Sequence, residues 1–106
     1  MPKLGTDTFK GKSGDNYVFN VYDGAMRFND FIPGVYLISR QDGDNASAIY
    51  LDHSDNVDIT LQKHHKKSCF EEHQFNRICF YRNASAEVRQ RVVDDLMPAL
   101  KPACNK

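Results

Sequence analysis

Three side chains of metal-binding type recur at intervals of four residues, namely His65, Cys69 and His73. Residues four apart share one face of a continuous helix, and imidazole and thiolate groups are common zinc ligands. Three features argue against a zinc site here. The surrounding glutamine and lysine residues are typical of a solvent-exposed surface, and a loop near residues 66–68 would interrupt the helix. No Cys-x-x-Cys pair accompanies the three residues, so we predict no bound metal at this position.

The same segment places a thiol close to imidazoles. A catalytic cysteine needs a neighbouring base, and His64 or His65 could activate Cys69 in this way. We favour the alternative, in which Cys69 and Cys79 pack as small apolar side chains. The chain has three cysteines, an odd number, and no apolar leader at its start. We therefore expect free thiols in a reducing cytosol rather than a disulfide framework, and a cytoplasmic protein.

A cluster of basic residues, Lys63-His64-His65-Lys66-Lys67, is the feature most typical of phosphate binding. The chain as a whole has 14 Lys and Arg against 14 Asp and Glu and a pI near 6.9. It therefore lacks the general positive field of most nucleic-acid-binding proteins, and any contact with nucleic acid must be local and weak. The alternative interpretation is a solvated helix end. The predicted binding residues are Lys63, His65, Lys66 and Lys67.

The composition indicates one folded domain. Of the 106 residues, 41% are hydrophobic and 26% are charged, values that are ordinary for a globular chain with a core. No apolar run approaches the roughly 18 residues that a membrane-spanning helix needs. We therefore expect a single compact domain without a membrane segment.

The first part of the chain, residues 1–32, is predicted to form a hairpin and a connecting loop. Two alternating stretches within residues 9–22 flank Ser13-Gly14-Asp15-Asn16, whose residues favour tight turns. Tyr17, Phe19 and Val21 share one face of the second strand. Residues 23–33 contain glycine, asparagine and proline without a sustained period, which predicts a connecting loop or a brief turn of helix.

Residues 33–106 are predicted to form the core of an α/β (α+β) fold. Three stretches, residues 34–39, 48–53 and 77–82, are rich in β-branched and aromatic residues and predict the strands of a small sheet, the first two central and the third central or near the edge. Helices are expected to pack against this sheet. One begins after the potential capping residues 54–56 and carries Val57 and Leu61, and a second short helix covers residues 69–74.

The last helix shows the clearest pattern. Ser85 is a potential N-cap, and an apolar residue recurs every fourth position at Val88, Val92, Leu96 and Leu100. This spacing predicts that Arg89, Arg91 and Asp95 point largely outward. We expect Pro98 to kink or end the helix, because a proline removes one helical hydrogen bond and crowds the preceding turn.

The order of these elements resembles the GIY-YIG endonuclease family. The resemblance rests on Gly34-Val35-Tyr36, on Tyr50-Leu51-Asp52, on the helix, strand and helix that follow, and on the closing Lys101-Pro102-Ala103-Cys104-Asn105. It covers residues 33–105, and each tripeptide alone is a weak signal. The hairpin lies outside this core and resembles an addition seen in some small bacterial members. The resemblance implies phosphodiester cleavage that depends on a divalent cation, usually magnesium.

Only part of the family's site is present in this sequence. Tyr36 and Tyr50 match the motif tyrosines that position or activate water, and Asn105 matches the terminal asparagine that organises the site. The alternative for the tyrosines is simple packing between sheet and helices, and Asn105 could only fix the chain end against the sheet. The arginine that contacts the phosphate corresponds to Thr60, and the metal-binding glutamate corresponds to Val93.

These replacements predict a nuclease-like domain without catalysis, because valine offers no oxygen ligand to a hard cation. We expect weak binding of nucleic acid as the retained function, and no cofactor. A protein-interaction module on the same fold is the first alternative. The second is a magnesium-dependent nuclease with a relocated carboxylate, either Asp52, which replaces the family's glycine, or Asp94.

Overall fold

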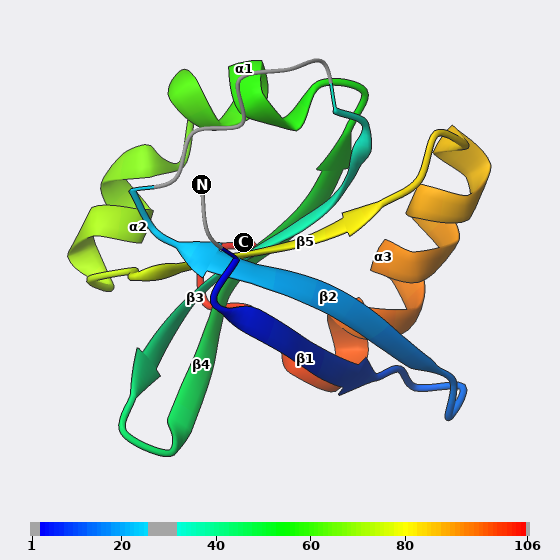
Figure 1. Cartoon of the computed structure of the whole chain (residues 1–106), viewed down its shortest axis with the longest axis horizontal. Coiled ribbons are helices and arrows are strands. Elements are labelled where there is room, and N and C mark those ends of the chain that lie inside the picture. Colours follow the sequence, from blue (N-terminus) through cyan, green and yellow to red (C-terminus); the bar gives the residue numbers. More distant parts are fainter. Residues whose placement is uncertain (1–2, 26–31, 106) are drawn as a thin grey trace.

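The computed structural model describes residues 3–25 and 32–105. The expected loop over residues 23–33 falls mainly on residues 26–31, which lie outside the described residues. The fold is an α+β domain, as the sequence predicts, with one curled antiparallel sheet and three helices (Figure 1). In chain order the elements are β1 (Gly5–Lys10), β2 (Asn16–Asp23), β3 (Gly34–Asp42), β4 (Asn45–Ser54), α1 (Val57–Gln62), α2 (Lys67–Glu72), β5 (Arg77–Arg82) and α3 (Ala86–Leu100).

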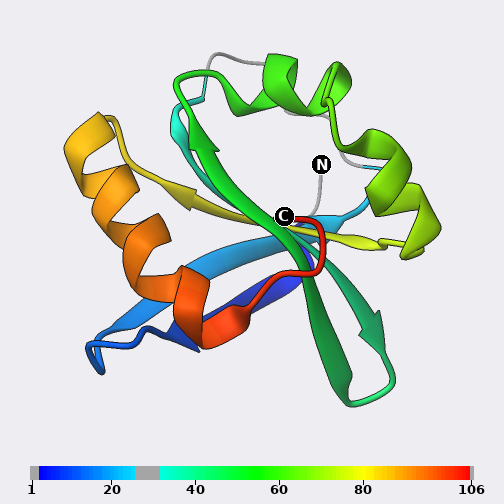
Figure 2. The ribbon, with the colours of Figure 1, turned by 180° about the vertical axis from the view of Figure 1, so that it is seen from behind.

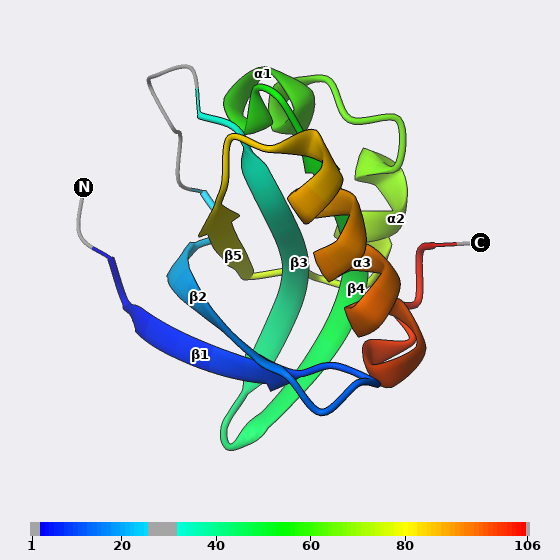
Figure 3. The same ribbon diagram turned by 90° about the vertical axis from the view of Figure 1, so that its right-hand side faces the viewer.

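The strands lie in the order β1-β2-β5-β3-β4, with β1 at the outer edge (Figure 3). The N-terminal hairpin is therefore continuous with the predicted three-stranded sheet, because β2 pairs with β5. β3 is buried on both faces, which confirms the interpretation of its uninterrupted apolar run. Gly34 begins this strand where no side chain fits, because a Cβ there would lie 2.4 Å from the Phe80 ring.

The prediction of a central position for residues 48–53 is wrong, because β4 is the last strand in the sheet order. Its outer edge is nevertheless covered by the C-terminal tail, which runs beside it (Figure 2). The backbone N–H of Ala103 donates to Ala48 O and that of Cys104 to Ile49 O. The tail satisfies backbone groups that an edge strand would otherwise expose, so β4 has the apolar composition of an inner strand.

Each sheet face carries its own apolar core. Tyr36, Ile38 and Tyr50 pack with α1 and α2 on one face. Val35, Leu37 and Leu51 pack with α3 on the other, because successive residues of a strand point to opposite faces. Phe19 and Val21 of β2 join the α3 core, which confirms their predicted common face. The two sides are visible in Figure 1, with α1 and α2 on one side and α3 on the other.

The starts of α1 and α3 agree with the sequence prediction, whereas both bounds of α2 differ from it. Asn56 caps α1 and Ser85 caps α3, each accepting from a backbone N–H three residues ahead. α2 begins at Lys67 and ends at Glu72, two residues earlier than predicted at each end. α3 continues through Pro98 and ends at Leu100, where Lys101 takes a positive φ of 47°. Pro98 is exposed and close to the last turn, so the helix accommodates it.

Asp95 does not point freely outward, as the helical spacing had predicted. Its carboxylate accepts hydrogen bonds from the Ser13 backbone N–H (2.8 Å), the Ser13 hydroxyl (2.7 Å) and the Tyr17 hydroxyl (2.7 Å). These bonds hold the pKa of Asp95 below its ordinary value and raise the pKa of Tyr17 to about 12. They attach the turn of the N-terminal hairpin to α3.

Candidate functional site

The structure brings together the two tyrosines that the resemblance singles out. Tyr36 on β3 and Tyr50 on β4 face α1 and α2, and their ring centroids are 6.1 Å apart. His64, in the connection between α1 and α2, contacts both rings, at 5.8 Å from Tyr36 and 4.8 Å from Tyr50. All three side chains are buried. We call Tyr36, Tyr50 and His64 the tyrosine–histidine cluster.

The hydrogen bonds of His64 define its protonation. Its Nδ1 accepts from the backbone N–H of Lys66 at 3.0 Å. The neutral ring then carries its proton on Nε2 and donates it to the Tyr36 hydroxyl oxygen, 2.8 Å away. Burial, followed by the neighbouring His65, lowers the pKa of His64 to about 4. His64 is therefore neutral at physiological pH and anchors the α1–α2 connection to the sheet.

Neither tyrosine is suited to act as a base. Burial and the nearby Asp52 raise the pKa of Tyr36 well above its ordinary value and that of Tyr50 to about 12. The Tyr50 hydroxyl donates to the Asp52 carboxylate at 3.2 Å. A phenol in this setting stays protonated and serves as a hydrogen-bond donor. The packing interpretation of the two tyrosines accounts for their burial.

One of the predicted binding residues, His65, lies against this cluster, and the three lysines flank it in sequence. His65 is exposed and stacks on His64, with ring centroids 4.7 Å apart and planes at 16°. Lys63 and Lys67 are exposed, and Lys66 is half-buried. We call Lys63, His65, Lys66 and Lys67 the basic segment. The buried His64 fixes its backbone, so these side chains extend from a defined surface.

The remaining family-matched positions do not join the cluster. Val93 is buried in the α3 core, on the opposite face of the sheet from the tyrosines. The Thr60 hydroxyl is within 2.7 Å of the Ser54 hydroxyl, with which it shares a hydrogen bond. Asn105 bonds both backbone groups of Leu51, accepting at 2.8 Å and donating at 2.9 Å. Asn105 thus fixes the tail to β4, which is the structural role considered for it.

The carboxylates proposed as relocated metal ligands, Asp52 and Asp94, do not form a suitable site for a magnesium ion. Asp52 is the carboxylate beside the tyrosines, and it already accepts from the Tyr50 hydroxyl and from the His53 backbone N–H. Asp94 is exposed on α3 and accepts from Gln90. Magnesium binds through near-ideal octahedral oxygen ligation. Neither proposed relocation brings a second carboxylate to the tyrosines, so we derive no catalytic step through a metal.

One charged side chain of α3 is buried, contrary to the sequence prediction. Arg89 was expected to point outward, but its side chain is 1% exposed. Its guanidinium donates to the Asp55 carboxylate, to His53 Nδ1 at 3.2 Å and to the Asn83 carbonyl at 2.9 Å. The sequence pattern that indicates this burial is the helical spacing of Arg89, Val93, Leu96 and Leu100. These four residues share one face of α3, which places the arginine with the core residues.

Replacing Asp55 with alanine should lower the free energy of unfolding by about 1 kcal/mol, because it removes a charged partner from a buried guanidinium but water can replace part of the bond at the 81% exposed Asp55. In an Arg89→Met background the same replacement should cost at most half as much, since no buried charge remains to be compensated. Urea unfolding of the four proteins of this double-mutant cycle measures the difference. Equal costs in both backgrounds would contradict the role given to the Arg89–Asp55 pair.

The prediction that all cysteines are free thiols is wrong. Cys69 and Cys104 form a disulfide that joins α2 to the C-terminal tail. The tail follows β4 and returns to the α2 side of the sheet, a proximity that a count of cysteines does not reveal. This bond also excludes the interpretation of Cys69 as a nucleophile in this state. Cys79 is free and buried, and burial raises its pKa to about 11, which agrees with its predicted apolar role.

The face of α1 and α2 also contains a cavity of about 290 Å³. Apolar side chains of β3, β5, α1 and α2 form much of its wall, and Asp58, Gln62 and Lys67 contribute polar groups. It adjoins the basic segment through Lys67. Its volume is at the lower end of the range for sites that bind drug-sized ligands.

No protein-family model matches the chain, and the comparisons with curated proteins and with solved structures returned no match. Within the described ranges, no helix is long and apolar enough to cross a membrane.

Proposed function

We propose that this domain binds the phosphate backbone of a nucleic acid through the basic segment and does not cleave it. The observation that carries this proposal is the attachment of the segment to the sheet. His64 is held by Tyr36, by Tyr50 and by the Lys66 backbone. A preorganised basic surface loses less conformational entropy on binding than a mobile lysine-rich loop.

The surface also offers a ring for stacking. His65 is exposed while its other face is supported by His64. Exposed rings on such supports stack with unpaired bases in single-stranded nucleic acids. The lysines would neutralise phosphates, and His65 would contact a base, which favours single-stranded over double-stranded targets.

Three observations support the absence of cleavage. The two tyrosines have raised pKa values. Thr60, at the position of the family's arginine, provides no cation, and Val93 is buried on the other face of the sheet. Phosphodiester hydrolysis needs an activated water and stabilisation of the developing charge. The protonated tyrosines do not activate a water, and neither Thr60 nor Val93 provides a cation or a metal ligand beside them.

The charge balance sets an upper limit on affinity. Glu71 and Glu72 are exposed on α2, close in sequence to the basic segment. The net charge of the chain is +0. Long-range attraction is therefore small, and the interaction depends on the few local contacts. Weak binding that disappears at moderate salt follows from this arrangement.

A Lys63→Gln, Lys66→Gln, Lys67→Gln variant should lose salt-dependent binding to a labelled single-stranded oligonucleotide, measured by fluorescence anisotropy. Each phosphate contact that is removed lowers the slope of log K against log salt by about 0.7. The matched control is Lys10→Gln, Lys12→Gln, Lys101→Gln, which removes the same charge from exposed positions elsewhere. The control should retain the slope. Equal loss in both variants would show a non-specific charge effect and contradict the proposed site.

A protein-interaction module is the second candidate, and the open edge of β1 favours it. β1 pairs with β2 alone among the described strands. An extended peptide of a partner could add to this edge by backbone hydrogen bonds. Binding there would not depend on the basic segment, so the two candidates predict responses at opposite ends of the sheet.

The cytoplasmic location expected from the sequence stays a prediction. The disulfide between Cys69 and Cys104 counts against it, because disulfides persist mainly in oxidising compartments.

A further inference from the structure

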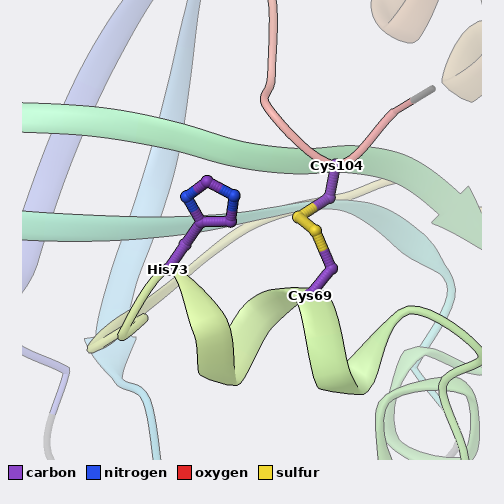
Figure 4. A group of neighbouring side chains, drawn as sticks. All are labelled: Cys69, His73 and Cys104. Atoms are coloured by element: carbon purple, nitrogen blue, oxygen red, sulfur yellow. A yellow bond between two sulfur atoms is a disulfide. The ribbon is translucent and has the colours of Figure 1, made fainter.

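A second group of reactive side chains lies outside the tyrosine–histidine cluster. Cys69 and His73 come from α2 and its C-terminal end, and Cys104 comes from the tail (Figure 4). The two sulfur atoms and the nearest ring nitrogen of His73 lie within 4.8 Å of one another. Figure 4 shows the imidazole on the same side of α2 as the two sulfur atoms. This is the one group of potential metal ligands found in the described part of the chain.

The backbone holds these residues in place independently of the sulfur–sulfur bond. The N–H of His73 donates to the Cys69 carbonyl at 3.1 Å, which continues the helical turn that aligns the two side chains. The N–H of Cys104 donates to Ile49 O at 2.6 Å, and the Asn105 side chain bonds Leu51 on the same strand. The Cα atoms of the two cysteines are 6.2 Å apart.

We propose that Cys69, His73 and Cys104 form a zinc site when the disulfide is reduced, so that this position holds either a disulfide or a zinc ion. The change involves two balanced steps. A dithiol reductant gives two electrons and two protons to the disulfide, which yields two thiols and the oxidised reductant. A zinc ion then replaces the two thiol protons, which pass to solvent, and the neutral His73 ring donates its lone pair.

The ligand chemistry selects zinc over hard cations. Two thiolates and one imidazole are soft or borderline donors, whereas magnesium and calcium prefer oxygen. Sulfur atoms in a tetrahedral zinc site lie about 2.3 Å from the metal. The sulfur atoms must therefore separate after reduction, which a small rotation of each side chain permits. Three protein ligands leave the fourth position to water, and the exposure of His73 gives solvent access there.

This proposal departs from the prediction of no bound metal at His65, Cys69 and His73, two of which are ligands in the proposed site. His65, the third residue of the four-residue pattern, precedes the start of α2 at Lys67 and stacks on His64 instead. Cys104 takes its place because the tail returns past α2. Zinc binding would not use the basic segment, so the test of this proposal does not depend on whether the protein binds nucleic acid.

The whole protein is first reduced with a phosphine, and the phosphine is then removed under an oxygen-free atmosphere. The test is titration of this reduced protein with Co²⁺, which serves as a spectroscopic substitute for zinc. We expect one equivalent to bind, with sulfur-to-metal charge-transfer bands and tetrahedral d–d bands, and one equivalent of Zn²⁺ to remove them. The oxidised protein should show no such bands. His73→Asn should weaken Co²⁺ binding by more than about 100-fold. This loss exceeds the one expected if His73 only formed a hydrogen bond to a metal ligand without binding the metal itself.

His65→Asn is the matched variant, because His65 lies four residues before Cys69 as His73 lies four after it. It should bind Co²⁺ like the wild type. Absence of the bands in reduced protein that is folded by circular dichroism would overturn the proposal, as would equal weakening in the two variants. If reduction unfolds the chain, zinc should restore the folded spectrum, and its failure to do so would also overturn the proposal.

Discussion

Removing the disulfide between Cys69 and Cys104 should lower the free energy of unfolding by roughly 3–4 kcal/mol. The two cysteines are 35 residues apart in sequence, and closing a loop of that length restricts the unfolded chain by about this amount. In the folded state the bond joins α2 to the tail that covers β4. The effect is a large fraction of the stability of a domain of this size.

Urea unfolding of a Cys69→Ser, Cys104→Ser variant measures this loss. A chelator is present in all samples, so that metal binding to the reduced wild type does not obscure the comparison. Reduced wild type should match the variant, and oxidised wild type should unfold at a higher urea concentration. Cys79→Ser controls for the loss of a thiol outside the disulfide. Equal midpoints for the oxidised and reduced wild type would contradict the stabilising role of the bond.

Acid should destabilise the protein through His64. The pKa of this ring is about 4 in the folded protein and 6.5 ordinarily, so the unfolded chain binds a proton over a range in which the folded protein does not. Stability is therefore greatest above pH 6.5 and decreases as the pH falls towards 4. At about 1.4 kcal/mol for each pH unit, the contribution is roughly 2–3 kcal/mol, allowing for partial solvation of the ring.

His64→Gln should remove this pH dependence, because glutamine can donate to the Tyr36 hydroxyl but does not gain a proton. The measurement is the free energy of unfolding in urea at pH 7 and at pH 4. Carboxylates titrate in the same range, so the quantity of interest is the difference between the wild type and the variant. His73→Gln serves as the control, since His73 is exposed at the end of α2 and does not contribute to the lowered pKa of His64, and it should follow the wild type. Parallel pH profiles for wild type and His64→Gln would refute the assignment.

Local sequence patterns predicted much of the fold. The uninterrupted apolar run of β3 indicated a strand covered on both faces, and Asn56 and Ser85 indicated two helix starts. These features depend on neighbours within a few residues. The position of β4 did not follow from its composition, because its apolar character reflects the tail that covers it. The same tail determines the disulfide, which depends on contact between residues far apart in sequence.

The candidate site was predictable in part for the same reason. The two tyrosines meet because β3 and β4 form a hairpin, whose register brings Tyr50 opposite Ile38, beside Tyr36. His64 lies in a connection without a periodic pattern, so nothing in the sequence marked it as their partner. Arg89 was missed because charged residues on helices are usually exposed. Its burial requires Asp55, His53 and Asn83, which approach α3 only in the folded chain.

The most direct test of the proposed function is an amide NMR titration of the labelled, oxidised protein with a short single-stranded oligonucleotide at low and moderate salt, followed by magnesium. We predict shifts at Lys63–Lys67 and at the neighbouring Tyr50, which decrease as salt rises, and no cleavage of the oligonucleotide after magnesium. Shifts confined to β1, or no shifts at low salt, would contradict nucleic-acid binding by the basic segment. Magnesium-dependent cleavage that Tyr50→Phe abolishes would contradict the proposed lack of catalysis.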